Sequence, residues 1–442
     1  MKDKIIKKLI KAERQRQKET INLIASENFV SKDILEALGS ELTNKYSEGY
    51  PGKRYYPGNK YYDEIEEIAK KRALKAFGLN QDEWSVNVQS YSGSPANFEI
   101  YSALLKPGEK LMGMALTSGG HLTHGHKASL TGKFWKSVQY TTGNDGLLNY
   151  DEIESLAKKE KPKVIVSGFS AYPRKVDFER FGEIANSVGA YHHADISHIA
   201  GLIVAGLHPS PFLFADTVMT TTHKTLRGPR GAVIFSRRKK ELRIMNHESS
   251  LTIAEAIDKA IFPGLQGGPH NNVISAIAVT FFEALRPSFK KYQKQIIKNA
   301  VVLSNELKKL GFNLVTGGTD THLVLINLSK SDFDNINGLE AEKKLEAVGI
   351  IANRNTVPGD ESPFNPSGLR LGTPAITTRG MKEKDMKKIA ELIYKVLRSP
   401  KSDVPNIVSL ALEVRLPNIG LTSKATSVIK KEVLALARRN RR

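Results

Sequence analysis

Between residues 63 and 265 the sequence alternates short apolar runs with longer stretches of helical periodicity, and this alternation constrains the fold more than any other feature. The runs are almost continuously apolar or β-branched, as buried parallel strands are. They begin at Leu111, Lys163, Ala190, Asp216 and Gly231. Strands separated by helices predict an α/β sheet with crossover connections, covered on both faces, whose functional loops lie at the carboxyl ends of the strands.

The pattern outside this region predicts two further domains, which gives an N-terminal helical arm over 1–50, a large α/β domain over 51–286 and a smaller α+β domain over 287–442. Residues 1 to about 45 are helical by pattern, with Ser31 and Asp33 as a cap. The Tyr, Gly and Pro-rich stretch from Asn44 to Tyr62 can be neither a regular helix nor a central strand. The elements predicted after Pro287 are two long basic helices, a strand from His322, a helix over 339–348 and a helix over 381–397.

Composition excludes several classes of protein. The chain has 442 residues, 40% of them apolar, and no cysteine, which rules out disulfides, thiolate zinc sites, iron–sulfur ligation and a cysteine nucleophile. No apolar run approaches the roughly 18–20 residues of a membrane span. The first 19 residues form a charged amphipathic pattern and do not resemble a secretory signal. A cytoplasmic location is the expectation, with an organelle address left open.

The net charge of +20, from 66 Lys and Arg against 46 Asp and Glu, invites a nucleic-acid interpretation. The lysines are nevertheless spread along predicted helices at 2–18, 290–309 and 382–388, and the run Arg438 to Arg442 lies at the end of the chain. This distribution favours solvated helix faces, and RNA binding is kept as an alternative.

Two groups of side chains could be drawn as zinc sites: His121, His124 and His126 in a Gly-rich loop, and His192, His193, Asp195 and His198 at a strand end. Neither group has a known zinc-binding spacing, and the first lacks a nearby carboxylate, so no metal is predicted. Gly120 and Gly125 have the glycine spacing of a P-loop, but His126 stands where its lysine would be.

An anion site is indicated at Ser90–Asn97, which follows an apolar run from Trp84 and precedes a helical pattern. Ser92, Gly93 and Ser94 can present backbone N–H groups and hydroxyls, and Pro95 suits the first helical position, so the helix N-terminus would face the same anion. An ordinary N-cap explains these residues equally well.

Lys224 favours the anion site over the ordinary N-cap. It lies between β-branched residues at the end of one predicted strand, where burial would lower its pKa and free its amine. Asp195, at the end of an earlier strand, can hold a protonated pyridine nitrogen, and a histidine such as His121 can stack on a ring. A phosphate cup, an aspartate and a lysine in this order are the parts that a pyridoxal-phosphate enzyme needs.

The same residues carry a resemblance to the serine hydroxymethyltransferase family, which extends from LIASEN at Leu23 to SGLRLGTPAITTRG at Ser367. The intervening motifs are LTNKYSEGYPGKRYY from Leu42, SGSPAN from Ser92, TSGGHLTHG from Thr117, HHADISHIAG from His192, TTTHKTLRGPRG from Thr220 and FPGLQGGPH from Phe262. The resemblance implies a fold-type-I, aspartate-aminotransferase-like transferase, with a large domain on a mostly parallel seven-stranded sheet and a smaller C-terminal α+β domain. The segment between Arg237 and Ile261 is longer than the family's compact version and has no assigned role, and the last forty residues match the family poorly.

The resemblance also implies roles around the cofactor. Lys224 is expected to form an aldimine with pyridoxal 5′-phosphate, Asp195 to hold the pyridine nitrogen and His121 to stack on the ring. His198 is expected near the phenolic oxygen and Thr221 beside the aldimine. The further cofactor-binding positions that the resemblance implies are Ser92, Gly93, Ser94, Ser170, His223, Tyr46 and, from the partner subunit, Gly268.

The implied reaction is the reversible conversion of L-serine and tetrahydrofolate to glycine and 5,10-methylenetetrahydrofolate, in one-carbon metabolism. Arg370 resembles the arginine that binds the substrate carboxylate, and Glu48 the catalytic glutamate. The other substrate and folate positions are Ser26, Tyr55, Tyr56, Leu116, Gly120 and Asn355. The resemblance implies a homodimer with shared active sites, with a tetramer as the alternative. A threonine aldolase would share Lys224, Asp195 and the phosphate cup, but would not need Glu48 or the folate positions.

Overall fold

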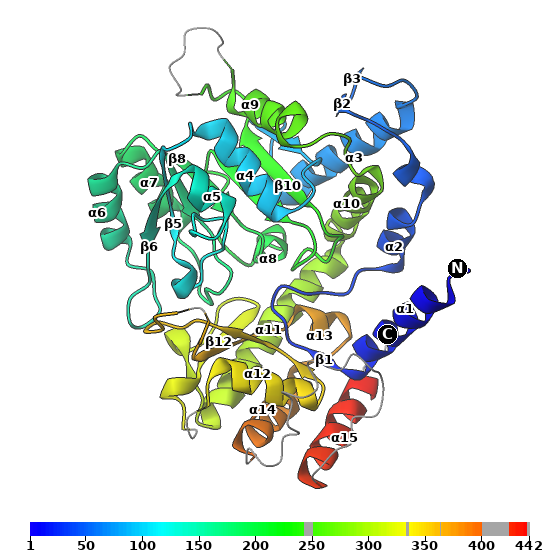
Figure 1. The fold of residues 1–442 in the computed structure, drawn as a ribbon, viewed down its shortest axis with the longest axis vertical. Coiled ribbons are helices and arrows are strands. Elements are labelled where there is room, and N and C mark those ends of the chain that lie inside the picture. The colour runs from blue at the N-terminus through cyan, green and yellow to red at the C-terminus, as the bar shows by residue number, and fades with distance from the viewer. Residues whose placement is uncertain (243–250, 333–335, 363, 400–423, 440–442) are drawn as a thin grey trace. The chain divides into compact units, whose positions relative to one another are not determined.

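The computed structural model describes residues 1–242, 251–332, 336–362, 364–399 and 424–439, which form two units (Figure 1). The sheet unit consists of Asn28–Ser170 and Lys175–Lys294. The terminal unit consists of Met1–Glu27, Ala171–Arg174 and Gln295–Arg442. None of the helices in these described ranges is long and apolar enough to span a membrane.

A seven-stranded sheet forms the centre of the sheet unit. Its strands are β4 (Trp84–Asn87), β5 (Lys110–Met114), β6 (Lys136–Tyr140), β7 (Val164–Ser167), β8 (Tyr191–Asp195), β9 (Thr217–Thr221) and β10 (Ala232–Arg237). They lie in the order β4-β10-β9-β8-β7-β5-β6, and the pairs from β9 to β6 are parallel. The predicted mostly parallel seven-stranded sheet is confirmed.

One predicted orientation is wrong. The apolar run from Gly231 forms β10, which is antiparallel to both β4 and β9. Only the residues from Thr222 to Gly231 connect β9 to β10, and a parallel crossover needs a dozen or more residues. The edge strand β6 is absent from the predicted runs because it is only partly buried and therefore not continuously apolar.

Helices cover both faces of this sheet. They are α2 (Lys32–Leu38), α3 (Lys60–Phe77), α4 (Gly93–Leu104), α5 (Leu130–Phe134), α6 (Tyr150–Glu160), α7 (Phe178–Ser187), α8 (Ala200–Val204), α9 (Ile253–Lys259) and α10 (Asn271–Ala284), with the short turns η1 (Glu41–Asn44), η2 (Leu116–Ser118) and η3 (Ala260–Leu265). Ile100 of α4 and Ile257 of α9 share a core with Ile234 of β10. On the opposite face, Phe235 of β10 packs edge-on against Phe77 of α3, with ring centroids 5.1 Å apart. Such two-sided burial explains the apolar strands.

The terminal unit is built on a four-stranded antiparallel sheet in the order β11-β12-β15-β14. The strands of this sheet are β11 (Asn313–Leu314), β12 (Leu323–Asn327), β14 (Asn353–Asn355) and β15 (Gly368–Gly372). Two further strands of the unit, β1 (Ile21–Asn22) and β13 (Ile350–Ile351), pair with each other in a separate sheet. The helices of the unit are α1 (Lys4–Glu19), α12 (Gly338–Ala347), α13 (Pro374–Thr378), α14 (Glu383–Arg398) and α15 (Lys424–Arg439), with η4 (Val315–Gly317) and η5 (Leu328–Lys330). The predicted smaller α+β domain is confirmed as a fold class. Residues 440–442 of the predicted basic tail lie outside the described residues.

Two element predictions need correction. One helix, α11 (Pro287–Lys309), occupies the place of the two predicted basic helices, because nothing in that segment breaks its periodicity. The predicted N-terminal helical region is α1 and α2, separated by an extended stretch in which β1 pairs in parallel with β13. Ser31 caps α2 as predicted, since its Oγ accepts a hydrogen bond from the backbone N–H of Ile34.

Arg379 joins the two ends of the chain. Its Nη1 donates to the backbone carbonyl oxygens of Thr20 (2.6 Å) and Gln17 (3.4 Å), and its Nη2 donates to those of Lys18 (3.0 Å) and Ala437. The helices α1 and α15 therefore both end at this guanidinium, whose positive charge stabilises the negative ends of the two helix dipoles.

The hairpin that precedes α3 is short. Its strands, β2 (Gly49–Tyr50) and β3 (Lys53–Arg54), pair in antiparallel register within the predicted Tyr, Gly and Pro-rich stretch. That stretch contains no long helix or central strand up to Asn59, as predicted, but the prediction is wrong for residues 60–62, which form the start of α3.

Candidate active site

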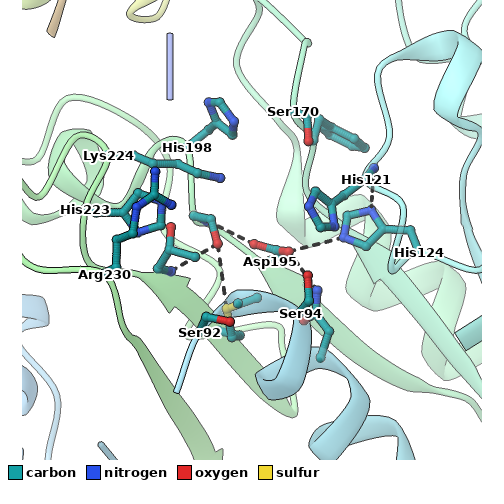
Figure 2. Close-up of a pocket in the computed structure, with 16 residues that line it drawn as sticks. Ser92, Ser94, His121, His124, Ser170, Asp195, His198, His223, Lys224 and Arg230 are labelled. Carbon is teal, nitrogen blue, oxygen red and sulfur yellow. Dashed lines mark hydrogen bonds and ion pairs between the residues drawn. The ribbon is translucent and has the colours of Figure 1, made fainter. Parts of the chain in front are cut away.

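The loops that follow β4, β5, β7, β8 and β9 enclose a cavity of about 210 Å³ at the carboxyl edge of the sheet (Figure 2). The predicted site residues that line this cavity are Ser92, Gly93, Ser94, His121, Ser170, Asp195, His198, Thr221, His223 and Lys224. Asn97, the last residue of the predicted anion segment, lines it too. Residues that the sequence did not assign to this site also line it: His124, Phe169, Ser197, Met219 and Arg230. Every lining residue belongs to the sheet unit.

The anion site forms at the start of α4. Ser92 occupies the N-cap position, but its side chain makes no capping hydrogen bond, so the hydroxyl is not used to close the helix. The helix begins at Gly93, which places Pro95 two residues later than predicted but still in the first turn, where no backbone N–H donor is needed. Gly93 and Ser94 of this turn line the cavity, and the N–H groups of a first helical turn suit an anion.

The approach of α4 to β9 requires a glycine at position 93. A Cβ atom built there would lie 2.6 Å from Cγ2 of Thr221, which is too close for any side chain. The Oγ1 of Thr221 and the Nδ1 of His223 are both buried and have no hydrogen-bond partner within the described chain. Two buried polar atoms without partners beside a helix N-terminus fit a bound phosphate group.

His223 is kept neutral by its surroundings. Burial lowers its pKa to about 3, and the positive charges of Lys224 and Arg230 act in the same direction. Arg230 also lines the cavity and adds a positive charge to the anion site. No pattern in the sequence distinguishes it from Arg227 in the same Gly-rich loop.

Asp195 ends β8 and faces the cavity. Its Oδ1 accepts a hydrogen bond from the backbone N–H of Ser197 (3.1 Å), and its Oδ2 lies 3.2 Å from Nε2 of His124. Burial alone would raise the pKa of Asp195, but the hydrogen bond from His124 and the charge of Lys224 outweigh it and hold the pKa well below its ordinary value. A carboxylate that stays ionised in a buried place can hold a protonated ring nitrogen.

A chain of buried polar side chains supports this carboxylate from behind. Nδ2 of Asn97 donates to Oδ2 of Asp195 (3.0 Å), and Oδ1 of Asn97 lies 3.0 Å from Nε2 of His193. Nδ1 of His193 lies 2.9 Å from Oγ1 of Thr217. Burial lowers the pKa of His193 to about 3, so the ring is neutral and can donate from Nε2 to Asn97 while it accepts from Thr217.

His121 lies in the loop after β5, next to Asp195 and His124 in Figure 2. The backbone N–H of Thr123 donates to its Nδ1 (3.2 Å), and Oγ1 of Thr123 lies 2.7 Å from the same nitrogen. These contacts fix the plane of the imidazole, as a ring that stacks on a flat ligand requires. Leu116 and Gly120, predicted to contact folate, lie in the same loop but not in the lining.

Lys224 follows β9 and is 9% exposed. Its side chain lies in the cavity beside His198 and His223 (Figure 2). The structure thus brings the predicted lysine, aspartate and anion site together around one cavity of the sheet unit.

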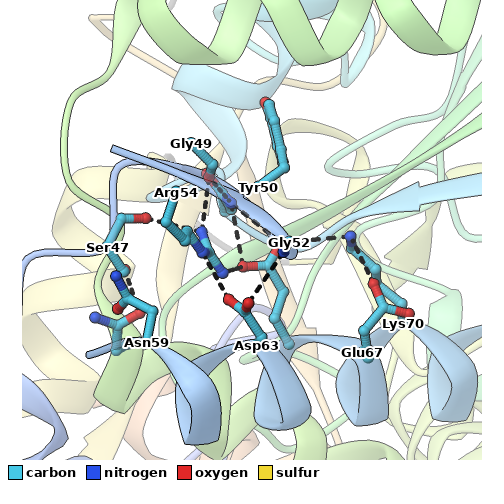
Figure 3. Close-up of polar contacts among 12 residues, drawn as sticks. Ser47, Gly49, Tyr50, Gly52, Arg54, Asn59, Asp63, Glu67 and Lys70 are labelled. Carbon is cyan, nitrogen blue, oxygen red and sulfur yellow. Dashed lines mark hydrogen bonds and ion pairs between the residues drawn. The ribbon is translucent and has the colours of Figure 1, made fainter. Parts of the chain in front are cut away.

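Glu48 lies outside that lining, in a loop that Arg54 holds (Figure 3). Nη1 of Arg54 donates to the carbonyl oxygens of Ser47 (2.8 Å) and Gly49 (2.7 Å), one on either side of Glu48. The same guanidinium forms ion pairs with Asp63 (2.8 Å) and with a second carboxylate of α3, that of Glu66 (2.7 Å). The backbone around Glu48 is therefore fixed by contacts within the sheet unit.

The other predicted aromatic residues of this loop gather near Glu48. We define the loop cluster as Tyr46, Glu48, Tyr55, Tyr56 and Gly268. The rings of Tyr46 and Tyr56 lie 5.3 Å apart, and the ring of Tyr46 packs on Gly268. Tyr55 is 74% exposed and Tyr46 57%. The cavity lining includes none of the five residues of the loop cluster.

Arg370, Ser26 and Asn355 belong to the terminal unit. Arg370 lies in β15, and its Nε donates to Oδ1 of Asn353 (3.2 Å). Burial lowers the pKa of Arg370 to about 10, so the guanidinium is still charged at neutral pH. Asn355 lies on the neighbouring strand, β14.

In the part of the chain that the structure describes, no group of three or more His, Asp or Glu side chains is arranged to hold a metal ion. The histidines that could be drawn as zinc ligands make other contacts. His192, for example, lies 2.7 Å through Nε2 from Oγ of Ser167 and 3.1 Å through Nδ1 from the carbonyl oxygen of Phe214.

Comparison with known proteins gives one family. A sequence model described as serine hydroxymethyltransferase matches residues 1–393. The serine hydroxymethyltransferase of Desulfotalea psychrophila is 51% identical over 408 residues, which are 92% of this chain and 91% of the relative. That of Mycoplasma mobile is 51% identical over 96% of each chain, and that of Acidothermus cellulolyticus is 52% identical over 89% of this chain and 88% of the relative.

Proposed function

The chain belongs to the serine hydroxymethyltransferase family, and we propose that the cavity at the carboxyl edge of its sheet is the cofactor site, with Lys224 as the point of covalent attachment. The enzyme is a pyridoxal-phosphate-dependent transferase that converts L-serine and tetrahydrofolate to glycine and 5,10-methylenetetrahydrofolate. The observation that carries the proposal is the convergence of Lys224, ionised Asp195 and two buried polar atoms without partners on one cavity.

The parts of the cavity divide the work of binding the cofactor. The N–H groups at Gly93 and Ser94 and the imidazole of His223 bind the phosphate. The hydroxyl of Thr221, which the resemblance places beside the link to Lys224, is reassigned to the phosphate because it is buried without a partner next to the start of α4. Asp195 holds the protonated ring nitrogen. The remaining cofactor contacts are assigned to His121, which stacks on the ring, and to Ser92, Ser170 and His198. When bound, pyridoxal 5′-phosphate supplies a protonated ring that draws electrons from the bond that breaks in the substrate.

The substrate residues orient serine and move its protons. Arg370 binds the carboxylate, because its planar guanidinium can form two parallel hydrogen bonds, and Ser26 and Tyr56 assist it. Glu48 transfers a proton between the hydroxyl of serine and the folate, which requires a carboxylate that changes its protonation state. The folate positions are Leu116, Gly120 and Asn355, with Tyr55 near the substrate.

A homodimer completes the site. The loop cluster is absent from the described lining of the cavity in its own chain, and Tyr46 and Tyr55 present more than half of their surface to solvent. We infer that each chain places its loop cluster in the cavity of the other chain, so that Glu48 and Gly268 of one subunit act with Lys224 of its partner. In a two-fold dimer each cavity receives a loop cluster from the other chain, so this arrangement does not require a tetramer. The expected location of the enzyme is the cytoplasm.

The attachment at Lys224 can be tested by substitution. Lys224→Ala is expected to lose all pyridoxal 5′-phosphate that sodium borohydride can fix to the protein, while the circular dichroism spectrum stays that of the wild type. A variant that still carries reducible cofactor would contradict the assignment. Titration with tetrahydrofolate separates the proposal from a threonine aldolase, which would bind the cofactor but not the folate.

A further inference from the structure

The peptide that carries Lys224 is held by side chains that do not line the cavity. Nδ2 of Asn28 donates to the carbonyl oxygen of Lys224 (2.9 Å), and the backbone N–H of Arg227 donates to the same oxygen (3.1 Å). Asn28 is 196 residues away in sequence, so this contact is not a product of the local turn. A carbonyl that accepts two hydrogen bonds from different directions has little freedom to rotate.

The next peptide is fixed in the same way. Nε2 of Gln293 donates to the carbonyl oxygen of Thr225 (2.7 Å). Oγ1 of Thr225 donates to the carbonyl oxygen of His198 (3.0 Å) and accepts from the backbone N–H of Gly201 (3.0 Å). Thr225 and Gln293 have no exposed surface. These bonds tie the lysine loop to α11 and to the loop after β8.

The loop is also strained. Arg227 has φ +63°, a left-handed conformation that costs a residue with a side chain about 1–2 kcal/mol. Its guanidinium lies 4.9 Å from the ring centre of Tyr292 and pairs with Glu283 (3.2 Å). The hydroxyl oxygen of Tyr292 in turn accepts from Nδ2 of Asn28 (2.8 Å). Strain of this kind persists only where surrounding contacts determine the backbone, and it is common at functional sites.

We propose that Asn28 is a positioning residue for Lys224, and that with Tyr292 and Gln293 it fixes the lysine peptide so that the amine meets the cofactor aldehyde in reactive geometry. This inference rests on the proposed attachment at Lys224. The amine replaces the aldehyde oxygen, which leaves as water. Because the attachment of a ligand depends on the position of the attacking atom, a displacement of about 1 Å can slow such a step by up to about 10²-fold.

The test compares two cofactor forms on the apoenzyme. Pyridoxal 5′-phosphate is captured by the apoenzyme, fixed with borohydride after timed intervals and measured on the Lys224 peptide by mass spectrometry. Pyridoxamine 5′-phosphate has the same phosphate and ring but an amine in place of the aldehyde, so it reports the binding site without attachment. For Asn28→Ala we expect capture to be roughly tenfold slower, with the affinity for pyridoxamine 5′-phosphate changed less than about twofold.

Asn272→Ala is the matched control. Nδ2 of Asn272 also donates to a distant backbone carbonyl, that of Leu38 (2.9 Å), within the same unit, and its loss should leave capture at the wild-type rate. If Asn28→Ala does not fold, Tyr292→Phe replaces it. That variant removes only the hydroxyl that accepts from Asn28 and should slow capture about threefold.

The outcomes separate the possible errors. Wild-type capture by Asn28→Ala or, where Asn28→Ala does not fold, by Tyr292→Phe would overturn the positioning role. Equal losses of capture and of pyridoxamine 5′-phosphate affinity would overturn it too, because they would mean that Asn28 supports the cup as a whole. If the wild type itself showed no cofactor on the Lys224 peptide, the proposed attachment would fail and the positioning role with it.

Discussion

Glu99 is a buried carboxyl group that the proposed reaction does not use. It lies on α4 with no exposed surface, and neither of its oxygens has a hydrogen-bond partner within 3.5 Å. Burial raises its pKa from 4.5 to about 7, although the nearby hydroxyl of Ser90 opposes the shift. The folded state therefore keeps a proton that the unfolded state releases as the pH rises from 4.5 to 7, so this group reduces stability over that window by about 3 kcal/mol in all.

Replacement of Glu99 tests whether its carboxyl group reduces the free energy of unfolding as the pH rises. Glu99→Gln removes the titration, so its free energy of unfolding should exceed that of the wild type more at pH 8 than at pH 4.5, by about 3 kcal/mol. Urea unfolding at the two pH values measures the difference. Glu36→Gln, which changes an exposed glutamate of α2, is the control and should show no such dependence. An equal effect of Glu99→Gln at both pH values would mean that folding does not raise the pKa of this carboxyl group.

Replacement of Glu48 tests its proposed role in the folate-dependent proton transfer. Glu48→Gln should slow the conversion of serine with tetrahydrofolate by a factor on the order of 10² or more, the usual loss of a general acid–base group. The folate-independent cleavage of larger 3-hydroxy amino acids should suffer far less. Both rates are measured on one preparation, and equal losses would assign Glu48 to the cofactor or to the fold.

Single residues differ in how well the sequence predicts their place. Lys224 and Asp195 could be placed because each directly follows or ends an apolar strand, and strand ends meet at one edge of a parallel sheet. The contact between Asn97 and His193 could not be predicted, because the two residues lie 96 positions apart on α4 and β8. No spacing in a sequence identifies the partner of a buried histidine. His124 drew attention only as a zinc ligand, whereas in the structure it lies beside Asp195.

At the scale of elements, the contact between α4 and β9 shapes the phosphate cup. Gly93→Ala would place a methyl group only 2.6 Å from Cγ2 of Thr221, so α4 or β9 would have to shift, and the affinity for pyridoxal 5′-phosphate should weaken by about tenfold or more. The double variant Gly93→Ala with Thr221→Ser removes the clash but keeps the hydroxyl, so it should recover most of that affinity. Fluorescence titration of the apoenzyme measures both.

A control for this prediction lies at the end of α2. Gly39→Ala meets only ordinary contacts, the nearest at 3.4 Å, and should bind the cofactor as the wild type does. If the double variant were as weak as Gly93→Ala, the close approach of α4 to β9 would not be what limits the affinity.

Elements were predictable where burial is continuous and local. The strands from Leu111 to Ile234 could be found because they are covered on both faces, and the helices because they are amphipathic. The direction of β10 depends on the length of its connection, and the partly buried β6 leaves no continuous apolar run. The hairpin before α3 is held by the guanidinium of Arg54, whose ion pairs with α3 are tertiary contacts that no local pattern contains.

At the scale of the whole molecule, the proposed exchange of loop clusters between two chains makes a quantitative prediction. Inactive Lys224→Ala and inactive Glu48→Gln chains are mixed in equal amounts, unfolded and refolded. In each mixed dimer one cavity would carry both substitutions and the other neither. Random pairing makes about half of the dimers mixed, so activity should recover to roughly a quarter of that of the wild type. A mixture that stays inactive, with mixed dimers verified by mass spectrometry, would contradict the exchange of loop clusters.

The proposed dimer is implied by the family resemblance and not by a pattern such as periodicity or spacing. The exposure of Tyr46 and Tyr55 becomes an argument for a contact surface only once the fold has shown that more than half of each side chain is exposed in its own chain. From the sequence alone, packing of the same tyrosines within their Pro and Gly-rich loop is as good an interpretation as a contact surface.

The bonds from Arg379 to both ends of the chain also have a consequence for protein synthesis. The first 27 residues belong to the same unit as residues 295–442, where β1 pairs with β13 and α15 provides the last contact. On the ribosome, the N-terminal segment emerges first and finds these partners last. Elongation from residue 295 to residue 437 takes about 7–30 s at typical rates, which gives the sheet unit time to fold beforehand. The nascent chain thus completes its terminal unit only after every residue of its sheet unit has been synthesised.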